Sequence, residues 1–459
     1  MREENMNLQS SWPKVLVRKW LNINSGRDKY HSDYRINAHF QRRKSCSDDG
    51  QYVVVSEELS EEWLVEKNSK TERPEFSQMP PPPIPNSNLR MFVGTWNVGG
   101  KSPDDQPNLK DWLRTKEPAD IYVLGFQEIV PLNAGNVLGL EDCGPAARWL
   151  SLIRQALNEP QYYKPRESFS DLLFLEDDGE DLVSNFSWRK QQKHYCLAAC
   201  KQMVGIFLCV WVRRDLLHHI TSLQVSCVGR GIMGYLGNKG SISISLVVQQ
   251  STFCFVCSHL ASGEKEGDAA RRNWDVMEIL RRTRFSQNHP HTILDHHNII
   301  WLGDLNYRLA SSSTGGDTNE LFYMNDWQAL LHKDELRIEQ KAGRVFKGFQ
   351  EGEIYFAPTY KYIANSDPYV VAPNDKRRTP AWCDRILWKG EGVEQIYYMR
   401  GESTFSDHRP VYSLFSVQLN APEYPTQNSA KSAVEELLVC RSRSRSQGCI
   451  HTASGIKFH

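Results

Sequence analysis

The stretch NIIWLGDLNYRL, residues 298–309, decides the fold class. It opens with an apolar run from Ile299 to Leu302, which is typical of a buried strand, and it turns polar at Asp304 and Asn306. Side chains on a strand alternate between its two faces, so residues two apart point the same way. The pattern therefore predicts a strand whose end carries a carboxylate and a carboxamide side by side.

Further β-rich runs of this kind recur through residues 89–420. Some alternate in hydrophobicity and others are continuously apolar, which indicates half-buried and fully buried strands in one fold. Helix-like stretches separate them, and this mixture predicts a single α/β domain. The runs include MFVGTWNV (91–98), IYVLGFQEI (121–129), TFCFVCSHL (252–260) and DRILW (384–388), and AARRNWDVMEILRRTRF (269–285) is a helix-like stretch.

The flanks of this domain differ from it in composition. Residues 1–78 are predicted to form an extension with a short amphipathic helix, SWPKVLVRKWLNINSG at 11–26, which would dock on its own domain or lie on a membrane surface. Four consecutive prolines make residues 79–88 a stiff linker. Residues 421–459, with RSRSRS at 441–446, are predicted to be a disordered tail.

The overall composition is that of an ordinary globular protein. The 459 residues include 55 Lys and Arg against 55 Asp and Glu, so bulk charge indicates no nucleic-acid partner. No apolar run approaches the ~18 residues of a membrane-spanning helix, and the first residues are too polar for a secretory signal. The scattered cysteines, with Cys254 and Cys257 interpreted as packed core thiols, fit a reducing compartment. We expect a cytoplasmic location, with peripheral membrane attachment and the nucleus left open.

Polar residues collect where the predicted strands end. Each position alone has a plain explanation, since a carboxylate often caps backbone N–H groups at a strand-end turn. That explanation accounts for one position but not for the set, which holds the residue types that metal-assisted phosphate chemistry requires. The set comprises Asn97, Glu128, His259, Asp304 with Asn306, Asp384, and Asp407 with His408.

Oxygen-bearing side chains of this set suggest a metal site and an attacking water. Mg²⁺ prefers carboxylates, water and phosphate oxygens, and Glu128 suits that task with Asn97 and Asp407 nearby. Asp304 could accept the proton of a water aimed at phosphorus, while Asn306 holds the geometry.

The histidines of the set fit the charge that develops during phosphate transfer. Charge growing on phosphoryl oxygens must be met by donors, which His259 and Asn306 can supply. A histidine in such a site needs its second ring nitrogen fixed, and Asp384 could do this for His408.

Two basic stretches could bind anions. GRGIMGYLGNKGSISIS (229–245) lacks the spacing of a nucleotide P-loop, but its backbone N–H groups, Arg230 and Lys239 could face an anionic surface. The second stretch, APTYKY (357–362), precedes further basic residues and suits a substrate with more than one phosphate. Its candidate ligands are Lys361, Lys376, Arg377, Arg378 and Arg385, and the alternative is a solvated basic face.

The motifs resemble those of a known family. WLGDLNYRL (301–309) and RTPAWCDRIL (378–387) are similar to the two signature motifs of the inositol polyphosphate 5-phosphatases. The similarity covers about residues 90–417, and the segment SWPKVLVRKWLNI resembles the plant type I members. Other blocks that match in order include TWNVGG, GYLGNKGSISI, APTYKY and FSDHRPV.

This resemblance implies a fold, a reaction and residue roles. The fold would be the deoxyribonuclease I-like four-layer α/β/β/α sandwich, and the reaction Mg²⁺-dependent hydrolysis of the 5-phosphate of inositol phosphates or phosphoinositides. Glu128 would be the principal Mg²⁺ ligand, supported by Asn97. Tyr360, Lys361 and Arg385 match the residues that grip the neighbouring 4-phosphate.

Two alternatives stay open. Another enzyme of the same fold, an endonuclease or a sphingomyelinase, would share the phosphate chemistry, and a non-catalytic phosphoinositide-binding protein would keep the basic residues alone. Soluble and lipid substrates are not distinguished, because both present the same phosphates. GIMGYLG (231–237) and VPLNAGNVLG (130–139) are candidate membrane-facing loops. No nucleic-acid partner is expected, and protein partners are not predicted.

Overall fold

Two six-stranded sheets organise the part of the chain that the computed structural model describes. The described residues are 88–103, 107, 109–113, 115, 118–158, 194–285, 290–310, 316–370 and 379–420. The predicted N-terminal helix, nearly all of the proline-rich linker and the RSRSRS segment lie outside them, so these stay predictions.

The first sheet has the strand order β11-β12-β1-β2-β4-β3, and the second has the order β5-β6-β7-β8-β10-β9. The first contains β1 (Asn88–Asn97), β2 (Ile121–Gln127), β3 (Tyr195–Met203), β4 (Ile206–Arg213), β11 (Val393–Arg400) and β12 (Val411–Gln418). The second contains β5 (Ile220–Gly229), β6 (Gly240–Val248), β7 (Ser251–His259), β8 (Asn298–Asp304), β9 (Gln350–Glu351) and β10 (Asp384–Lys389).

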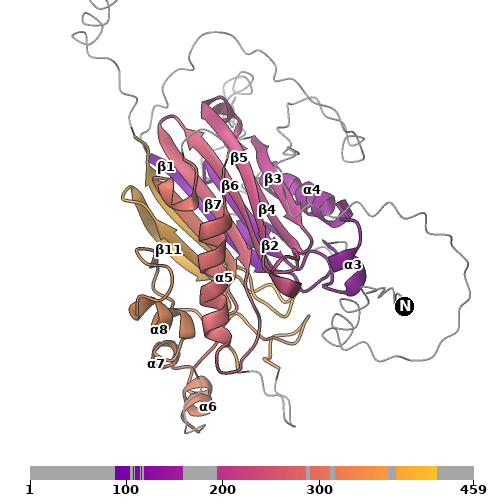
Figure 1. Cartoon of the computed structure of the whole chain (residues 1–459), viewed down its shortest axis with the longest axis vertical. Helices are drawn as coiled ribbons and strands as arrows, with labels where there is room; N and C mark the ends of the chain where they lie inside the picture. The colour runs from indigo at the N-terminus through magenta and orange to yellow at the C-terminus, as the bar shows by residue number, and fades with distance from the viewer. Residues whose placement is uncertain are drawn as a thin grey trace, which may run out of the picture. The chain divides into compact units, whose positions relative to one another are not determined.

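Helices cover the outer faces of both sheets. Figure 1 shows α5 across the face of β6 and β7, with α4 against β3. The α-helices are α2 (Leu109–Leu113), α3 (Ala134–Leu138), α4 (Gly144–Asn158), α5 (Asp268–Arg282), α6 (Gly316–Tyr323), α7 (Trp327–Leu331) and α8 (Glu335–Lys341). The 3₁₀ helices are η4 (Arg214–His219), η5 (Ile232–Gly234) and η6 (Ile293–Asp295).

The alternation along the strands divides the apolar residues into three layers. On β8, Ile300 and Leu302 join the core between the two sheets, whereas Ile299 and Trp301 point to the outer layer beneath α5. A third cluster, which includes Trp149 of α4, covers the outer face of the first sheet. The layers are therefore helix, sheet, sheet and helix, which confirms the predicted α/β/β/α sandwich.

The topology brings the predicted strand ends to one edge of each sheet. β1 runs parallel to β2, and β7 runs parallel to β8, with His259 opposite Asp304. β10 and β12 run antiparallel to β8 and β1, so Asp384 lies opposite Asp304 and β12 begins where β1 ends. The carboxyl ends of β1, β2, β7 and β8 therefore lie at the same edges as the amino ends of β10 and β12.

The two cysteines of the CxxC sequence on β7 lie in the interior of the protein. Cys254 and Cys257 are both fully buried and belong to different apolar layers, so they point to opposite faces of β7. This places both as packed core thiols, as predicted.

Among the described helices, none combines the length and the hydrophobicity needed to cross a bilayer.

Candidate active site

His259 and Asp304 face each other at the ends of β7 and β8. Nε2 of His259 lies 3.1 Å from Oδ2 of Asp304, and both side chains are buried. The close approach depends on Gly303, whose φ is 143° and where a Cβ would lie 2.0 Å from the carbonyl oxygen of Ser258. Only glycine fits there without strain. Nδ2 of Asn97 donates to the same Oδ2 of Asp304 at 3.0 Å.

Asp304 is held in its ionised form. Burial acts to raise the pKa of its carboxyl, but the neighbouring His259, which lies within hydrogen-bonding distance, opposes burial. The nearby charges of His408 and Lys239 add to this, so the pKa of Asp304 lies well below its ordinary value. An ionised carboxylate accepts hydrogen bonds only, which suits it to orient a water molecule.

Asn306 reaches the site from beyond the strand and not from within it. β8 ends at Asp304, and Asn306 has a left-handed backbone with φ of 58°. Its backbone N–H donates to Oδ1 of Asp304 at 3.1 Å, so the strand-end turn considered as a plain explanation is present as well. Its Nδ2 donates to the carbonyl of Leu260 at 3.2 Å, and this bond orients the carboxamide.

His408 and Asp384 form a second buried pair. Nδ1 of His408 lies 2.8 Å from Oδ2 of Asp384, which also accepts the hydroxyl of Thr359 at 2.7 Å. Burial lowers the pKa of His408, but the charge and the hydrogen bond of Asp384 raise it to about 9. Burial raises the pKa of Asp384, while His408 acts in the opposite direction. We assign the proton to His408, which is then cationic at neutral pH.

Tyr360 forms a wall of this site. Its buried ring packs against the imidazole of His408 at a tilt of 35°, with 4.3 Å between the ring centroids. The next residue, Lys361, donates from Nζ to Oδ2 of Asp407 at 2.9 Å. Both residues therefore lie at the candidate site, where the ring of Tyr360 packs against His408, and their predicted contact with a 4-phosphate stays a prediction.

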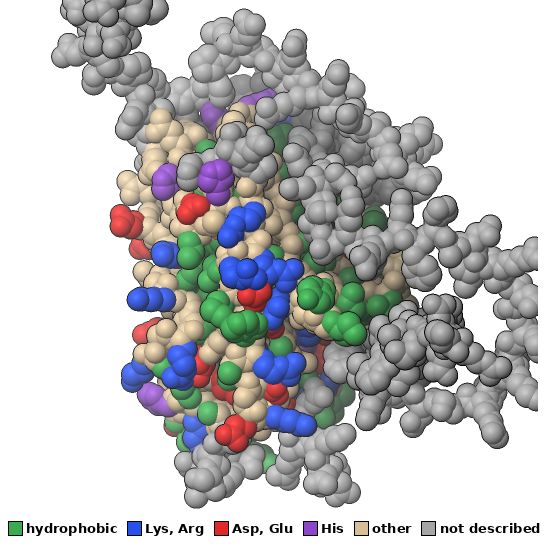
Figure 2. All heavy atoms as spheres, viewed as in Figure 1, with side chains coloured by type: hydrophobic (Ala, Val, Ile, Leu, Met, Phe, Trp, Pro, Cys, Tyr) green, Lys and Arg blue, Asp and Glu red, His purple; other side chains and the backbone are tan. Residues whose placement is uncertain are grey.

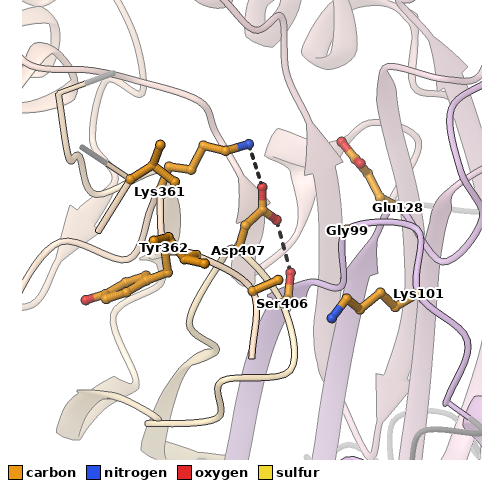
Figure 3. A pocket seen from close by; sticks show the side chains of 10 residues that line it. Gly99, Lys101, Glu128, Lys361, Tyr362, Ser406 and Asp407 are labelled. Carbon is orange, nitrogen blue, oxygen red and sulfur yellow. Dashed lines mark hydrogen bonds and ion pairs between the residues drawn. The ribbon is translucent and has the colours of Figure 1, made fainter. Parts of the chain in front are cut away.

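A pocket of about 380 Å³ opens beside these pairs (Figure 3). Figure 3 shows Glu128 across the pocket from Asp407 and Lys361. Glu128 has a left-handed backbone, and its side chain is 28% exposed with Oε1 3.8 Å from Nε2 of His259. The lining is Gly99, Lys101, Glu128, Lys361, Tyr362, Ile363, Ala364, Val370, Ser406 and Asp407.

Carboxylates on the pocket wall fit a hard divalent cation. Burial acts to raise the pKa of Asp407, but His408 and Lys361 lower it overall, so its oxygens are negative. Together with Glu128 it offers the oxygen donors that such a cation prefers. The amide oxygen of Asn97 accepts the backbone N–H of Gly99 at 3.0 Å, so only its second lone pair faces other partners.

A second cluster has metal-like spacing but suits proton chemistry better. Ligand atoms of Asp304, Asp384 and His408 all lie within 4.8 Å of one another. Because Nδ1 of His408 is bonded to Asp384 and the ring holds its proton, the imidazole has no lone pair to give a metal. The cluster therefore presents a positive charge between two carboxylates.

Lys239 and Arg230 do not face outward as the sequence suggested. Lys239 is buried, and its Nζ contacts Nε2 of His259. Burial lowers the pKa of both groups, and the nearby Lys239 lowers that of His259 further. Arg230 turns toward α5, where its Nε donates to Oδ1 of Asp275 at 3.0 Å.

The expectation that Arg385 grips a 4-phosphate is wrong. Its guanidinium is fully buried and paired with Asp334 at 3.0 Å and Glu351 at 2.6 Å. The physical reason is strand alternation, since Arg385 follows Asp384 on β10 and points to the opposite face. Lys376, Arg377 and Arg378 lie outside the described residues, so their assignment stays a prediction.

Arg308 is a site residue that the sequence reasoning missed. It is buried, and its guanidinium lies 4.6 Å from the centroid of the Tyr360 ring. Its Nη2 donates to Oδ1 of Asn306 at 2.8 Å, and its Nη1 donates to Glu264 at 3.1 Å. The signal was its place two residues after Asn306, because an arginine beside a buried strand end needs an acidic or polar partner.

Comparisons with known proteins show the family of this chain. Residues 94–414 match the model of the Endonuclease/Exonuclease/phosphatase family 2. The chain is 57% identical to type I inositol polyphosphate 5-phosphatase 8 of Arabidopsis thaliana, over 90% of this chain and 87% of that protein. It is 44% identical to type I inositol polyphosphate 5-phosphatase 4 of the same plant, over 93% and 96% of the two chains.

A solved structure is similar in fold. It is the inositol polyphosphate 5-phosphatase domain of a synaptojanin, in complex with inositol 1,4-bisphosphate and a calcium ion. The match has a TM-score of 0.59 and 29% identity, and it covers 78% of this chain and 93% of the other. The chain described here therefore belongs to the inositol polyphosphate 5-phosphatase family of hydrolases.

Proposed function

We propose that this protein removes the 5-phosphate from inositol polyphosphates and phosphoinositides in an Mg²⁺-dependent reaction, and so terminates inositol phosphate and calcium signalling. The observation that carries the proposal is the buried carboxylate of Asp304, which lies against His259 and Asn97 and whose ligand atom is within 4.8 Å of those of His408 and Asp384. The candidate substrates are inositol 1,4,5-trisphosphate, inositol 1,3,4,5-tetrakisphosphate, phosphatidylinositol 4,5-bisphosphate and phosphatidylinositol 3,4,5-trisphosphate.

The ligand of the synaptojanin relative supports this substrate class. Removal of the 5-phosphate from inositol 1,4,5-trisphosphate leaves inositol 1,4-bisphosphate, which is the molecule bound in that relative. In the present chain, Lys361 lines the pocket and has an ammonium group suited to a second phosphate. We assign the 4-phosphate to Lys361.

Hydrolysis requires water to attack phosphorus as the bond to the inositol oxygen breaks. Asp304 orients that water through its ionised oxygens, and Asn306 holds the arrangement through its bonds to Leu260 and Arg308. The imidazolium of His408 stabilises negative charge that develops on the phosphoryl oxygens. The attacking water loses a proton as its oxygen bonds to phosphorus, and the leaving oxygen takes up a proton from solvent and becomes the 5-hydroxyl.

Glu128 and Asp407 would hold Mg²⁺, with Asn97 contributing its remaining lone pair. When bound, the ion supplies Lewis-acid polarisation of a phosphoryl oxygen. The fit rests on the donor chemistry of the pocket wall, where negative oxygens face one another across the cavity (Figure 3).

Contact with a membrane surface is part of the proposal. The two loops singled out in the sequence expose large apolar side chains, with Tyr235 69% exposed and Leu140, just beyond the second loop, 94% exposed. Met233 and Leu138 are exposed beside them. Such side chains can enter the interface of a bilayer while the pocket receives a headgroup. We propose a cytoplasmic enzyme that acts at membranes peripherally.

Phosphate release tests the proposal. Wild type and Asp304→Ala are compared with and without Mg²⁺, on soluble inositol 1,4,5-trisphosphate and on phosphatidylinositol 4,5-bisphosphate in vesicles. We expect Mg²⁺-dependent release that falls by on the order of 10²–10⁴-fold in the variant. Cleavage of DNA or sphingomyelin instead would favour another enzyme of this fold, and binding without any turnover would favour a phosphoinositide-binding protein.

A further inference from the structure

Helix α5 carries a buried carboxylate that the proposed chemistry does not use. Asp275 lies midway along the helix and is only 4% exposed. Other charged residues of α5, such as Arg271 and Arg281, face solvent, and Figure 2 shows basic side chains on this face of the molecule. Burying a carboxylate is costly unless it is paired and hydrogen-bonded. The partners of Asp275 therefore indicate its task.

The two oxygens of Asp275 bind two separate segments. Oδ1 accepts from Nε of Arg230 at 3.0 Å, and Oδ2 accepts from the backbone N–H of Ala261 at 3.1 Å. Arg230 follows β5, and its own backbone N–H donates to the carbonyl of Lys239 at 2.7 Å. Ala261 comes two residues after His259. One carboxylate thus ties the loop between β5 and β6, residues 230–239, to the segment that leaves β7.

The segment from Leu260 to Gly263, which we name the post-β7 segment, positions Asn306. The N–H of Leu260 donates to the carbonyl of Asp304 at 3.0 Å, and the carbonyl of Leu260 accepts Nδ2 of Asn306 at 3.2 Å. A displacement of this segment would therefore move the carboxamide that holds the attacking water in place.

Arg272 fastens the same segment from α5. Its Nη1 donates to the carbonyls of Ala261 at 3.3 Å and Gly263 at 3.0 Å. Its Nη2 pairs with Glu335, which also accepts the backbone N–H of Arg308 at 2.8 Å. Helix α5 thus binds the backbone of the post-β7 segment through the acceptor Asp275 and the donor Arg272. Through Glu335 it is also connected to Arg308, which binds Asn306.

We propose that Asp275 is a positioning residue for the reaction under "Proposed function", on which this inference rests. It holds the post-β7 segment so that the Leu260 carbonyl orients Asn306, and it fixes the distance from that segment to the loop that carries Lys239. Asp275 does not contact substrate. Its effect is on geometry, and misplacement of about 1 Å can cost on the order of 10²-fold in rate.

Three variants test this inference. Asp275→Ala removes both acceptors, whereas Asp275→Asn keeps one oxygen and carries the test if the alanine variant does not fold. Glu278→Gln is the matched control, because Glu278 lies on the same helix with Oε2 3.9 Å from Nη1 of Arg230 but pairs with Arg281 and not with the post-β7 segment. Each is assayed for Mg²⁺-dependent release of phosphate from inositol 1,4,5-trisphosphate.

We expect kcat of the Asp275 variants to fall by on the order of 10²-fold, with KM within about twofold of wild type. Glu278→Gln should keep the wild-type kcat. Hydrogen exchange provides a readout that does not depend on activity, and the Ala261 amide should exchange faster in the Asp275 variants only.

Two results would overturn the inference. The first is a wild-type kcat in folded Asp275 variants, and the second is unchanged exchange at Ala261. A wild type that releases no phosphate from any substrate would refute the proposed function instead. The exchange measurement would then still decide whether Asp275 holds the post-β7 segment.

Discussion

His408 precedes a strand of the first sheet and Asp384 begins a strand of the second, yet their Nδ1 and Oδ2 atoms lie 2.8 Å apart. The pair is enclosed by the hydroxyl of Thr359 and the ring of Tyr360. This contact raises the pKa of His408 to about 9 and keeps its ring cationic where phosphate would bind.

The first prediction concerns pH. A raised pKa means that His408 is fully charged below its ordinary value of 6.5 and loses its charge as pH rises through about 9. The stabilisation from the pair should decline between about pH 6.5 and 9, and the activity that needs the charge should fall as pH passes about 9. Asp384→Asn should move the alkaline limb of kcat against pH to lower pH. An unmoved limb would show that Asp384 does not set this pKa.

The second prediction concerns Arg308. Arg308→Lys keeps the positive charge but loses the planar guanidinium. A single ammonium group cannot bond Asn306 and Glu264 at once and also lie flat over the ring of Tyr360. We expect kcat to fall roughly tenfold or more, with a small change in KM. Steady-state kinetics on inositol 1,4,5-trisphosphate measures this. Full activity of the lysine variant would remove Arg308 from the positioning of Asn306.

The third prediction separates phosphate recognition from catalysis. Lys361→Ala should lower kcat/KM for substrates that carry a 4-phosphate by the equivalent of about 1.5–3 kcal/mol, the usual worth of a hydrogen bond to a charged group. Substrates that lack the 4-phosphate serve as the control and should lose far less. Equal losses on both kinds of substrate would contradict the assignment of Lys361.

The fourth prediction tests the corrected role of Arg385. Arg385→Gln leaves Asp334 and Glu351 buried without their cation, which should cost about 3–5 kcal/mol of the free energy of unfolding. Urea denaturation measures this loss. KM of the folded fraction should stay near the wild-type value, and a large selective rise in KM for substrates with a 4-phosphate would restore the original interpretation.

The fifth prediction concerns the metal. Glu128→Gln should raise the Mg²⁺ concentration for half-maximal rate by about tenfold or more, because it replaces a negative ligand with a neutral one. Activity of the variant at saturating Mg²⁺ should recover more than that of Asp304→Ala. An unchanged Mg²⁺ dependence would exclude Glu128 as a ligand.

The sequence could predict the layers and most of the site because both depend on strand periodicity. Apolar alternation fixed the faces of β8, and polar residues at strand ends identified Asp304, His259 and Asp384 before their pairing was known. Asn306 was placed at the site by the same rule, although its position depends on a left-handed turn beyond the strand.

The remainder depended on contacts between distant segments. A basic residue near a phosphate site is readily interpreted as an anion ligand. For Arg385, only the register of β10 shows that the side chain faces Asp334 instead. Asp275 looks like an ordinary residue of an amphipathic helix until α5 docks on the sheet. Its partners Arg230 and Ala261 lie 45 and 14 residues away, which no local pattern reveals.

The hydrogen bond from Asn97 to Asp304 makes activity sensitive to the packing of the two sheets. These residues come from different sheets and are separated by 207 positions in the chain, with the core between the sheets directly behind them. Neither sheet holds a complete set of reactive groups, so turnover reports whether the two sheets are docked. A separation of the two sheets that leaves the strands of each sheet intact would already abolish turnover. Activity is therefore a more sensitive probe of inter-sheet packing than a measurement of secondary-structure content.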